Sequence, residues 1–442
     1  MTIDILCKVV DNYGDIGVAW RLARALSELP DPPRLRLVVD DLEAFVALRP
    51  GLDPRATFQV AKGIEVVAWQ GPLGPEAAAS FRARPASAIV ECFACGRPDW
   101  LEDMLFAPGA PPSLVVDLEH LTAEPYAAEL HLMPSLTRSA SVRKAMFLPG
   151  FDEGTGGLVL DRSFEQTLAR ASSEEGRAEL RRSVIATLTG AAPGAAAQPD
   201  AIGPVGAALA APDDAVGRFW VAVFGYERDY GRIVADLAAF AARCAARCGV
   251  AGTGGDDARG SVPAGTVRGS VPDATSGRPL LALAAAGKSQ ACFLAAWEAA
   301  GRPFPALALP FLPQETWDRI LAASDFSIVR GEDSWARAAL AGRPFLWQAY
   351  PQAERHQMVK VEAFLRRLQR HFRPADFAPI ARAYRAFNDR DRDESGTAGD
   401  ESPGSLFDAY GTAAAGFQAL AASLAARTNL AADLLTFFRE SV

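Results

Sequence analysis

Apolar runs alternate with amphipathic stretches along the first 150 residues. The apolar run Ile3–Val10 is followed by a helical pattern over Val18–Leu29. The same criteria predict further strands at Leu35–Val39, Ile64–Trp69, Ala88–Glu91 and Ser113–Leu118. Strands that alternate with helices are typical of a parallel sheet covered on both faces. We therefore expect a doubly wound α/β domain over residues 1–150.

A second alternating pattern covers residues 216–370. Helical patterns occupy Asp229–Cys248 and 356–370. Strands are predicted at Phe219–Phe224, Leu280–Ala285, Ala306–Phe311, Phe326–Val329 and Pro344–Trp347. The pattern predicts a second α/β domain.

The remaining segments differ in composition from these two units. Residues 151–215 begin with glycines, which we interpret as a hinge. From residue 164 they hold a helical stretch and then an Ala/Gly/Pro-rich stretch at 190–206, which we interpret as a flexible insertion. Residues 249–278 are low in complexity and are predicted to form a disordered loop. The chain ends in helices over 405–442, which we expect to pack back on the N-terminal domain.

The composition narrows the classes of partner. The net charge is -8 and the sequence pI is about 5.3, which argues against nucleic acid as a partner. The first residues already form a strand that contains Asp4, so we expect no signal peptide. No apolar run reaches membrane-spanning length, and six cysteines do not make a disulfide scaffold. We expect a cytoplasmic protein that does not enter a membrane.

The turn after the first predicted strand carries two carboxylates and two glycines. Asp11 and Asp15 stand at the strand end and in the turn, and Gly14 and Gly17 permit a tight turn with close backbone approach. Turns at the carboxyl ends of strands are where open α/β sheets bind ligands, so the carboxylates could hold a cationic or hydroxyl acceptor. Structural roles, as a helix N-cap and a turn residue, fit the same spacing.

A second turn, at Arg330–Ser334, also joins a predicted strand to a helix. The amides of a helix start and the hydroxyl of Ser334 suit a phosphate, and Arg330 could clamp a diphosphate. Glu332 and Asp333 would repel phosphate, so sugar or base hydroxyls, or their own backbone, suit them better. An N-capped helix with a surface ion pair is the structural alternative. Together the two turns indicate two α/β domains that face each other across a ligand cleft.

Phe311, Gln314 and Trp317 follow another predicted strand. The two rings could sandwich a nucleobase while Gln314 contacts its edge, although aromatic residues at this spacing are more often part of a core.

Other short motifs do not match the phosphate or metal sites that they resemble. Gly287–Ser289 resembles the end of a P-loop, but Ala282 stands where that motif needs glycine. The pairs Cys92–Cys95 and Cys244–Cys248 lie in different domains and suit core thiols better than a zinc site. The four histidines form no ligand cluster in sequence, so we expect no metal site.

Many short segments, in family order over residues 1–365, make this chain similar to the elongation factor P arginine rhamnosyltransferases, the EarP family. The matching segments are Asp4-Ile5, Val9–Gly17, Trp20–Arg24, Val39–Leu42, Glu91–Cys95, Phe147–Phe151, Thr155–Leu158, Phe224–Glu227, Leu309–Gln314, Arg330–Ser334, Ala341–Phe345 and Tyr350–Gln352.

This resemblance implies a GT-B glycosyltransferase fold: two facing Rossmann-like domains, with the acceptor on the first and the donor nucleotide on the second. It implies transfer of rhamnose from dTDP-β-L-rhamnose to one arginine of translation elongation factor P. The transfer would invert the anomeric centre and need neither a metal ion nor another cofactor.

The resemblance also implies roles for individual residues. Asp11 and Asp15 match the acceptor-side carboxylates, with Asp15 as the hypothesised base and Asp11 as its orienting partner, and these roles could be exchanged. We include Glu332 among the candidate catalytic carboxylates. The residues that match the nucleotide pocket are Tyr226, Phe311, Gln314, Trp317 and Tyr350, and those that match the donor and diphosphate grip are Arg330, Glu332, Asp333 and Ser334. The family pattern favours Phe at the place of Trp317, where the larger ring should still stack.

Two alternatives stay open at this point. One is a GT-B nucleotide-sugar enzyme with another acceptor, or an epimerase of similar fold. The other is a nucleotide-sugar-binding regulator without catalysis, against which the presence of both Asp11 and Asp15 argues.

Overall fold

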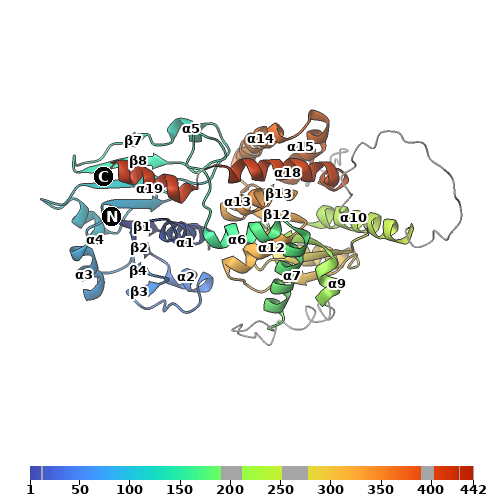
Figure 1. The fold of residues 1–442 in the computed structure, drawn as a ribbon, viewed down its shortest axis with the longest axis horizontal. Helices are drawn as coiled ribbons and strands as arrows, with labels where there is room; N and C mark the ends of the chain where they lie inside the picture. Colours follow the sequence, from blue (N-terminus) through green and yellow to red (C-terminus); the bar gives the residue numbers. More distant parts are fainter. Residues whose placement is uncertain (11–12, 191–211, 251–276, 390–402, 428, 442) are drawn as a thin grey trace.

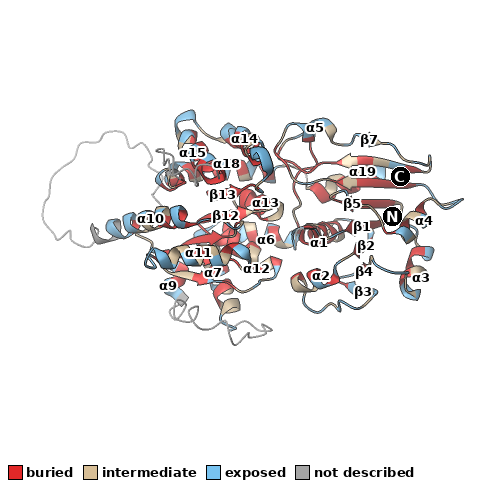
Figure 2. Ribbon diagram, turned by 180° about the vertical axis from the view of Figure 1, so that it is seen from behind, coloured by how far each residue is buried: buried red, intermediate tan, exposed pale blue. Residues whose placement is uncertain are grey.

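The computed structural model describes residues 1–10, 13–190, 212–250, 277–389, 403–427 and 429–441. They form two α/β domains that lie side by side, with both chain ends on the N-terminal domain (Figure 1). Each domain is built on its own sheet, and the strands of both sheets are mostly buried (Figure 2).

The N-terminal sheet has eight strands in the order β3-β4-β2-β1-β5-β6-β8-β7, of which the edge strands β3 and β7 run antiparallel to their neighbours. The strands are β1 (Thr2–Cys7), β2 (Arg34–Val39), β3 (Phe58–Ala61), β4 (Ile64–Ala68), β5 (Ala88–Cys92), β6 (Ser113–Leu118), β7 (Pro134–Ser135) and β8 (Val142–Phe147). The helices are α1 (Gly14–Ser27), α2 (Leu42–Leu48), α3 (Pro75–Ala83), α4 (Asp99–Leu105) and α5 (Tyr126–Leu130). Apolar residues of α1 and α2 contribute to one core cluster and those of α3 and α4 to another, so this sheet is doubly wound.

The C-terminal sheet has five parallel strands in the order β11-β10-β9-β12-β13. The strands are β9 (Phe219–Val223), β10 (Leu280–Ala284), β11 (Ala306–Ala308), β12 (Phe326–Arg330) and β13 (Phe345–Gln348). The helices are α6 (Arg162–Ala171), α7 (Glu174–Leu188), α9 (Pro212–Gly217), α10 (Gly231–Val250), α11 (Lys288–Ala299), α12 (Gln314–Ala323), α13 (Glu332–Ala341), α14 (His356–Leu368), α15 (Pro374–Asn388), α17 (Ser405–Asp408), α18 (Tyr410–Ala425) and α19 (Leu430–Ser441), with 3-10 turns at Ala353–Arg355 and Gln369–His371.

The chain order of the strands places a switch point in each sheet. β1 lies between β2 and β5, and β9 lies between β10 and β12. The connections after β1 and β5 therefore run in opposite directions along the sheet, as do those after β9 and β12. The loops that begin these connections diverge and open a crevice. The turns after β1 and β12 are the two turns that the sequence singles out.

The structure corrects several sequence-based boundaries. The first strand ends at Cys7 rather than Val10, and α1 already begins at Gly14. The strands β3, β7 and β8 were not predicted. The helical stretch expected from residue 164 is present as α6 and α7, which pack on each other and on α12.

The C-terminal helices divide between the domains instead of all packing on the first. α18 packs on α13, whereas α19 packs on α1. The stretches 190–206 and 249–278 fall almost entirely outside the described residues. None of the helices in the described part of the chain is both long and apolar enough to cross a membrane.

Candidate active site

A cleft with a volume of about 1150 Å³ lies at the carboxyl ends of both sheets. Its lining comes from the turns after β1, β5 and β6 in the N-terminal domain and after all five strands of the C-terminal sheet. Ligand pockets commonly measure about 300–1,000 Å³, so this cleft has room for a large ligand together with a second group.

The β1–α1 turn forms one part of the N-terminal wall of the cleft. Asp15 lies in the first turn of α1, is nearly buried, and its Oδ2 accepts a 2.8 Å hydrogen bond from the amide of Val10. Gly14, the first residue of α1, also lines the cleft, and the ring of Tyr13 contacts that of Phe311 across it, with centroids 4.8 Å apart. Asp11 lies outside the described residues.

Gly17 and Gln314 make a close contact between the domains. The side-chain amide of Gln314 is buried and donates a 3.1 Å hydrogen bond to the carbonyl of Gly17. A Cβ at position 17 would lie 2.9 Å from Gln314 Nε2, so a larger residue there would displace the Gln314 amide. Gln314 therefore joins α12 to α1; it also lines the cleft, and its expected contact with a base stays a prediction.

Aromatic rings and a guanidinium form the opposite wall. Arg330 lies over the rings of Phe224 and Tyr226, at 4.7 Å from each centroid. Tyr226 also packs edge-on against Tyr350, and Tyr350 and Phe311 are both substantially exposed. No role was predicted for Phe224, which directly follows β9.

Trp317 lies further inside this wall. Its Nε1 donates to Ser334 Oγ at 3.1 Å, and its ring meets that of Phe224 edge-on. Ser334 is thus engaged by an indole rather than capping its own helix. Its hydroxyl still carries a proton that it can donate to an anion.

Two helix starts face the cleft. Gly287 precedes α11 and Gly331 precedes α13, with φ angles of +137° and +66° that favour glycine. Both glycines line the cleft, as do Lys288 and Lys360. Unsatisfied amides at helix starts together with cationic side chains make a suitable site for phosphate. Sequence analysis set aside Gly287–Ser289 as a failed P-loop, yet the structure brings part of it to this site.

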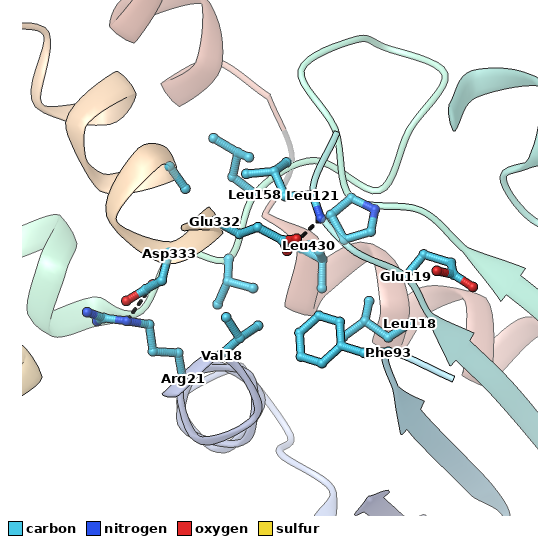
Figure 3. A pocket seen from close by; sticks show the side chains of 13 residues that line it. Val18, Arg21, Phe93, Leu118, Glu119, Leu121, Leu158, Glu332, Asp333 and Leu430 are labelled. Atoms are coloured by element: carbon cyan, nitrogen blue, oxygen red, sulfur yellow. Dashed lines mark hydrogen bonds and ion pairs between the residues drawn. The ribbon is translucent and has the colours of Figure 1, made fainter. Parts of the chain in front are cut away.

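Glu332 reaches from the start of α13 to the N-terminal domain. Its Oε1 lies 2.7 Å from His120 Nδ1. Its Oε2 accepts a 2.8 Å hydrogen bond from the amide of Leu121 (Figure 3). Burial disfavours the imidazolium, but the hydrogen bond and charge of Glu332, reinforced by Asp15 and Glu119, raise the pKa of His120 above its ordinary value.

Asp333 also turns toward the N-terminal domain. Its Oδ1 lies 2.7 Å from Arg21 Nε, beside a small cavity of about 40 Å³ (Figure 3). Arg21 is buried and makes two 2.7 Å hydrogen bonds to Asp318 of α12. Asp333 thus joins the domains; it also lines the cleft, and its expected contact with the donor stays a prediction. The network extends to Arg24, Asp161, Glu315 and Arg337.

Among the described residues there is no group of three or more His, Cys, Asp or Glu side chains that could hold a metal ion. Cys92 and Cys244 are buried, and Cys95 Sγ donates to the carbonyl of Leu6.

Two facing Rossmann-like domains, with acidic groups on one wall of the cleft and a nucleotide-suited wall opposite, define a glycosyltransferase of the GT-B fold. The family model described as Elongation-Factor P (EF-P) rhamnosyltransferase EarP matches residues 3–244 and 273–439. The chain belongs to the EarP family.

Similar proteins agree with this assignment. A protein-arginine rhamnosyltransferase of Pseudomonas aeruginosa is 34% identical over 386 residues, which cover 86% of this chain and 85% of the relative. One from Neisseria meningitidis serogroup B is 30% identical over 366 residues, 81% of this chain and 77% of the relative. A solved structure, described as the structural basis for EarP-mediated arginine glycosylation of translation elongation factor EF-P, matches the fold with a TM-score of 0.50 at 22% identity, covering 100% of this chain and 99% of that one.

Proposed function

We propose that this protein transfers rhamnose from dTDP-β-L-rhamnose to an arginine side chain of elongation factor P, with inversion at the anomeric carbon. The observation that carries the proposal is the division of the cleft into two chemically different walls. The N-terminal wall offers carboxylates to a guanidinium, and the C-terminal wall offers rings, cations and helix starts to a nucleoside diphosphate. The names of the similar proteins supply the sugar and the amino acid.

The donor wall suits dTDP in two parts. The exposed rings of Phe311 and Tyr350 are available to stack on the base. Arg330, Lys288 and the amides at the start of α13 can bind the diphosphate and stabilise the negative charge that builds on it as it leaves. These groups supply the charge compensation, so the proposal includes no metal ion or other cofactor.

The acceptor wall suits an arginine because its carboxylates can pair with a planar, positively charged guanidinium. Since a guanidinium is protonated at any working pH, it is a poor nucleophile and needs a base. Asp15 can pair with it, and we propose Asp15 as the base with Asp11 as the orienting partner. A guanidinium nitrogen forms a bond to the anomeric carbon while the bond from that carbon to the dTDP oxygen breaks. The electron pair leaves with dTDP, and the proton from the nitrogen passes to the carboxylate.

Intact-mass spectrometry of elongation factor P, incubated with this protein and dTDP-β-L-rhamnose, tests the proposal. One added deoxyhexose that maps to a single arginine is the expected result. Absence of any addition under conditions where dTDP binds would refute the acceptor and leave a nucleotide-sugar enzyme with another acceptor. Binding of dTDP-rhamnose without transfer to any acceptor or to water would favour a regulator.

A further inference from the structure

The start of α13 poses an electrostatic problem for donor binding. Its free amides and the helix dipole favour an anion, yet the first two helical residues are Glu332 and Asp333. Two carboxylates directed at a diphosphate would weaken its binding through repulsion. Their surroundings therefore decide whether this helix start can bind the donor.

Both carboxylates turn away to partners in the N-terminal domain, but the two partners differ in kind. Asp333 pairs with Arg21, which keeps its charge at every working pH. Glu332 pairs with His120, whose charge is lost as the pH rises through its pKa. The amide of Leu121 also holds Glu332, but an amide carries no net charge with which to compensate the carboxylate.

We propose that His120 is a positioning residue for donor binding: its imidazolium holds Glu332 against the N-terminal wall and compensates the negative charge of Glu332 beside the diphosphate site. The inference rests on the proposed function, since it takes a nucleoside diphosphate sugar as the ligand. It assigns a role to a histidine that belongs to no sequence motif.

The surroundings of His120 fix the direction of the pH effect. The charged groups that face it are Glu332 on α13, Asp15 on α1 and Glu119 on its own loop, all carboxylates, while the ring of Phe93 stacks on it with centroids 4.3 Å apart. These acids raise the pKa of the imidazole. The imidazolium is therefore present below that pKa and is lost above it, so donor affinity falls as the pH rises.

Calorimetric titration of the full chain with dTDP-β-L-rhamnose, without elongation factor P, at a pH below and a pH above the His120 pKa, tests this. The donor is a diphosphate esterified at both ends and lacks the second phosphate ionisation near pH 6 of a monoester, so its own charge stays constant. We expect the wild type to lose about three- to fivefold in affinity, in keeping with the energies of partly exposed ion pairs. His120→Gln and Glu332→Gln should abolish the pH dependence.

Two further variants sharpen the comparison. His120→Lys carries a charge that does not titrate in this range, so it should retain tight binding at both pH values. His371→Gln is the matched control, because His371 is partly exposed and does not line the cleft. It should keep the wild-type pH dependence. A wild-type affinity that is the same at both pH values, or a His120→Gln variant that keeps the full pH dependence, would overturn the inference.

A second measurement does not depend on the donor. The chain has four histidines, so the titration of each imidazole can be followed by NMR with labelled histidine, and His120 assigned from its missing signal in His120→Gln. The pKa of His120 should exceed that of a free histidine and should fall in Glu332→Gln. An ordinary pKa that Glu332→Gln leaves unchanged would overturn the pairing even if no transfer to elongation factor P occurs. Transfer of rhamnose to elongation factor P without a His120–Glu332 pair would support the proposed function and overturn the role of His120.

Discussion

Replacement of Arg21 by methionine should destabilise the protein far more than loss of an exposed arginine. The guanidinium of Arg21 is almost completely buried. It lies within 2.7 Å of oxygens of Asp318 and Asp333, and 3.4 Å from Asp161. Burial alone raises the pKa of a carboxyl group, and at Asp161 the charges of Arg337, Arg24 and Arg21 outweigh it and lower the pKa. Removal of one cation leaves these acids in the interior with less compensation.

The magnitude follows from the burial of both partners. Loss of one partner of a buried ion pair typically costs about 3–5 kcal/mol, because the other charge stays in a medium of low polarity. Asp318→Asn should cost less, since Arg21 keeps its contacts with Asp333 and Asp161. In the double variant Arg21→Met/Asp318→Asn we expect a loss smaller than the sum of the two single losses by about 1–3 kcal/mol.

A matched control is available on the surface. Arg385 also makes a two-point contact with a carboxylate, that of Glu362, but their side chains are 46% and 37% exposed. An exposed pair contributes about 0–1 kcal/mol, so Arg385→Met should change little. Urea unfolding followed by circular dichroism and by tryptophan fluorescence measures both losses, and coincident transitions justify the use of a single free energy. A loss in Arg21→Met no larger than that in Arg385→Met would refute the reasoning.

Three further predictions concern the cleft. Asp15→Asn should abolish transfer in the mass assay with little change in dTDP affinity. Asp40→Asn should retain activity, because Asp40 anchors the neighbouring amide of the same turn without lining the cleft. Equal losses of activity in both variants would mean that Asp15 only anchors the turn. Gly17→Ala should reduce the steady-state rate of transfer by displacing the Gln314 amide. The second substitution Gln314→Ala should restore part of that rate. Arg330→Lys should lower dTDP affinity about tenfold, because lysine lacks the planar guanidinium that stacks on the rings and can make paired hydrogen bonds. An unchanged affinity in calorimetry would mean that Arg330 does not bind the diphosphate.

The sequence predicted the architecture well because alternation of strands and helices is a local signal. Buried parallel strands are continuous apolar runs, and the pattern located all five strands of the second sheet. The strand β8 escaped detection because Arg143 and Lys144 interrupt its apolar pattern. The charge of Lys144 is accommodated by Asp117 of the adjacent β6 and by Glu91 of β5, which local patterning cannot reveal.

The site was only partly accessible to the same reasoning. Asp15, Arg330 and Ser334 were identified because each stands at a strand-to-helix turn, and such turns meet at one edge of a sheet. The partners of Glu332 and Gln314 could not be found in this way. They lie in the opposite domain, so they depend on how one domain is placed against the other. His120 in particular carries no sequence signal apart from being a histidine in a loop.

The interdomain pairs also bear on the chemistry. Arg21 and the proposed base Asp15 lie on the same helix, six residues and about 9 Å apart along its axis. Asp333 belongs to the helix whose start lines the cleft at the proposed diphosphate site. The contact between Arg21 and Asp333 therefore helps to set the distance between the proposed acceptor carboxylate and the proposed donor site, although neither residue has to touch the reacting atoms. Because a misplacement of about 1 Å can cost about a hundredfold in rate, a change in this contact should reduce the rate of transfer more than the affinity for dTDP.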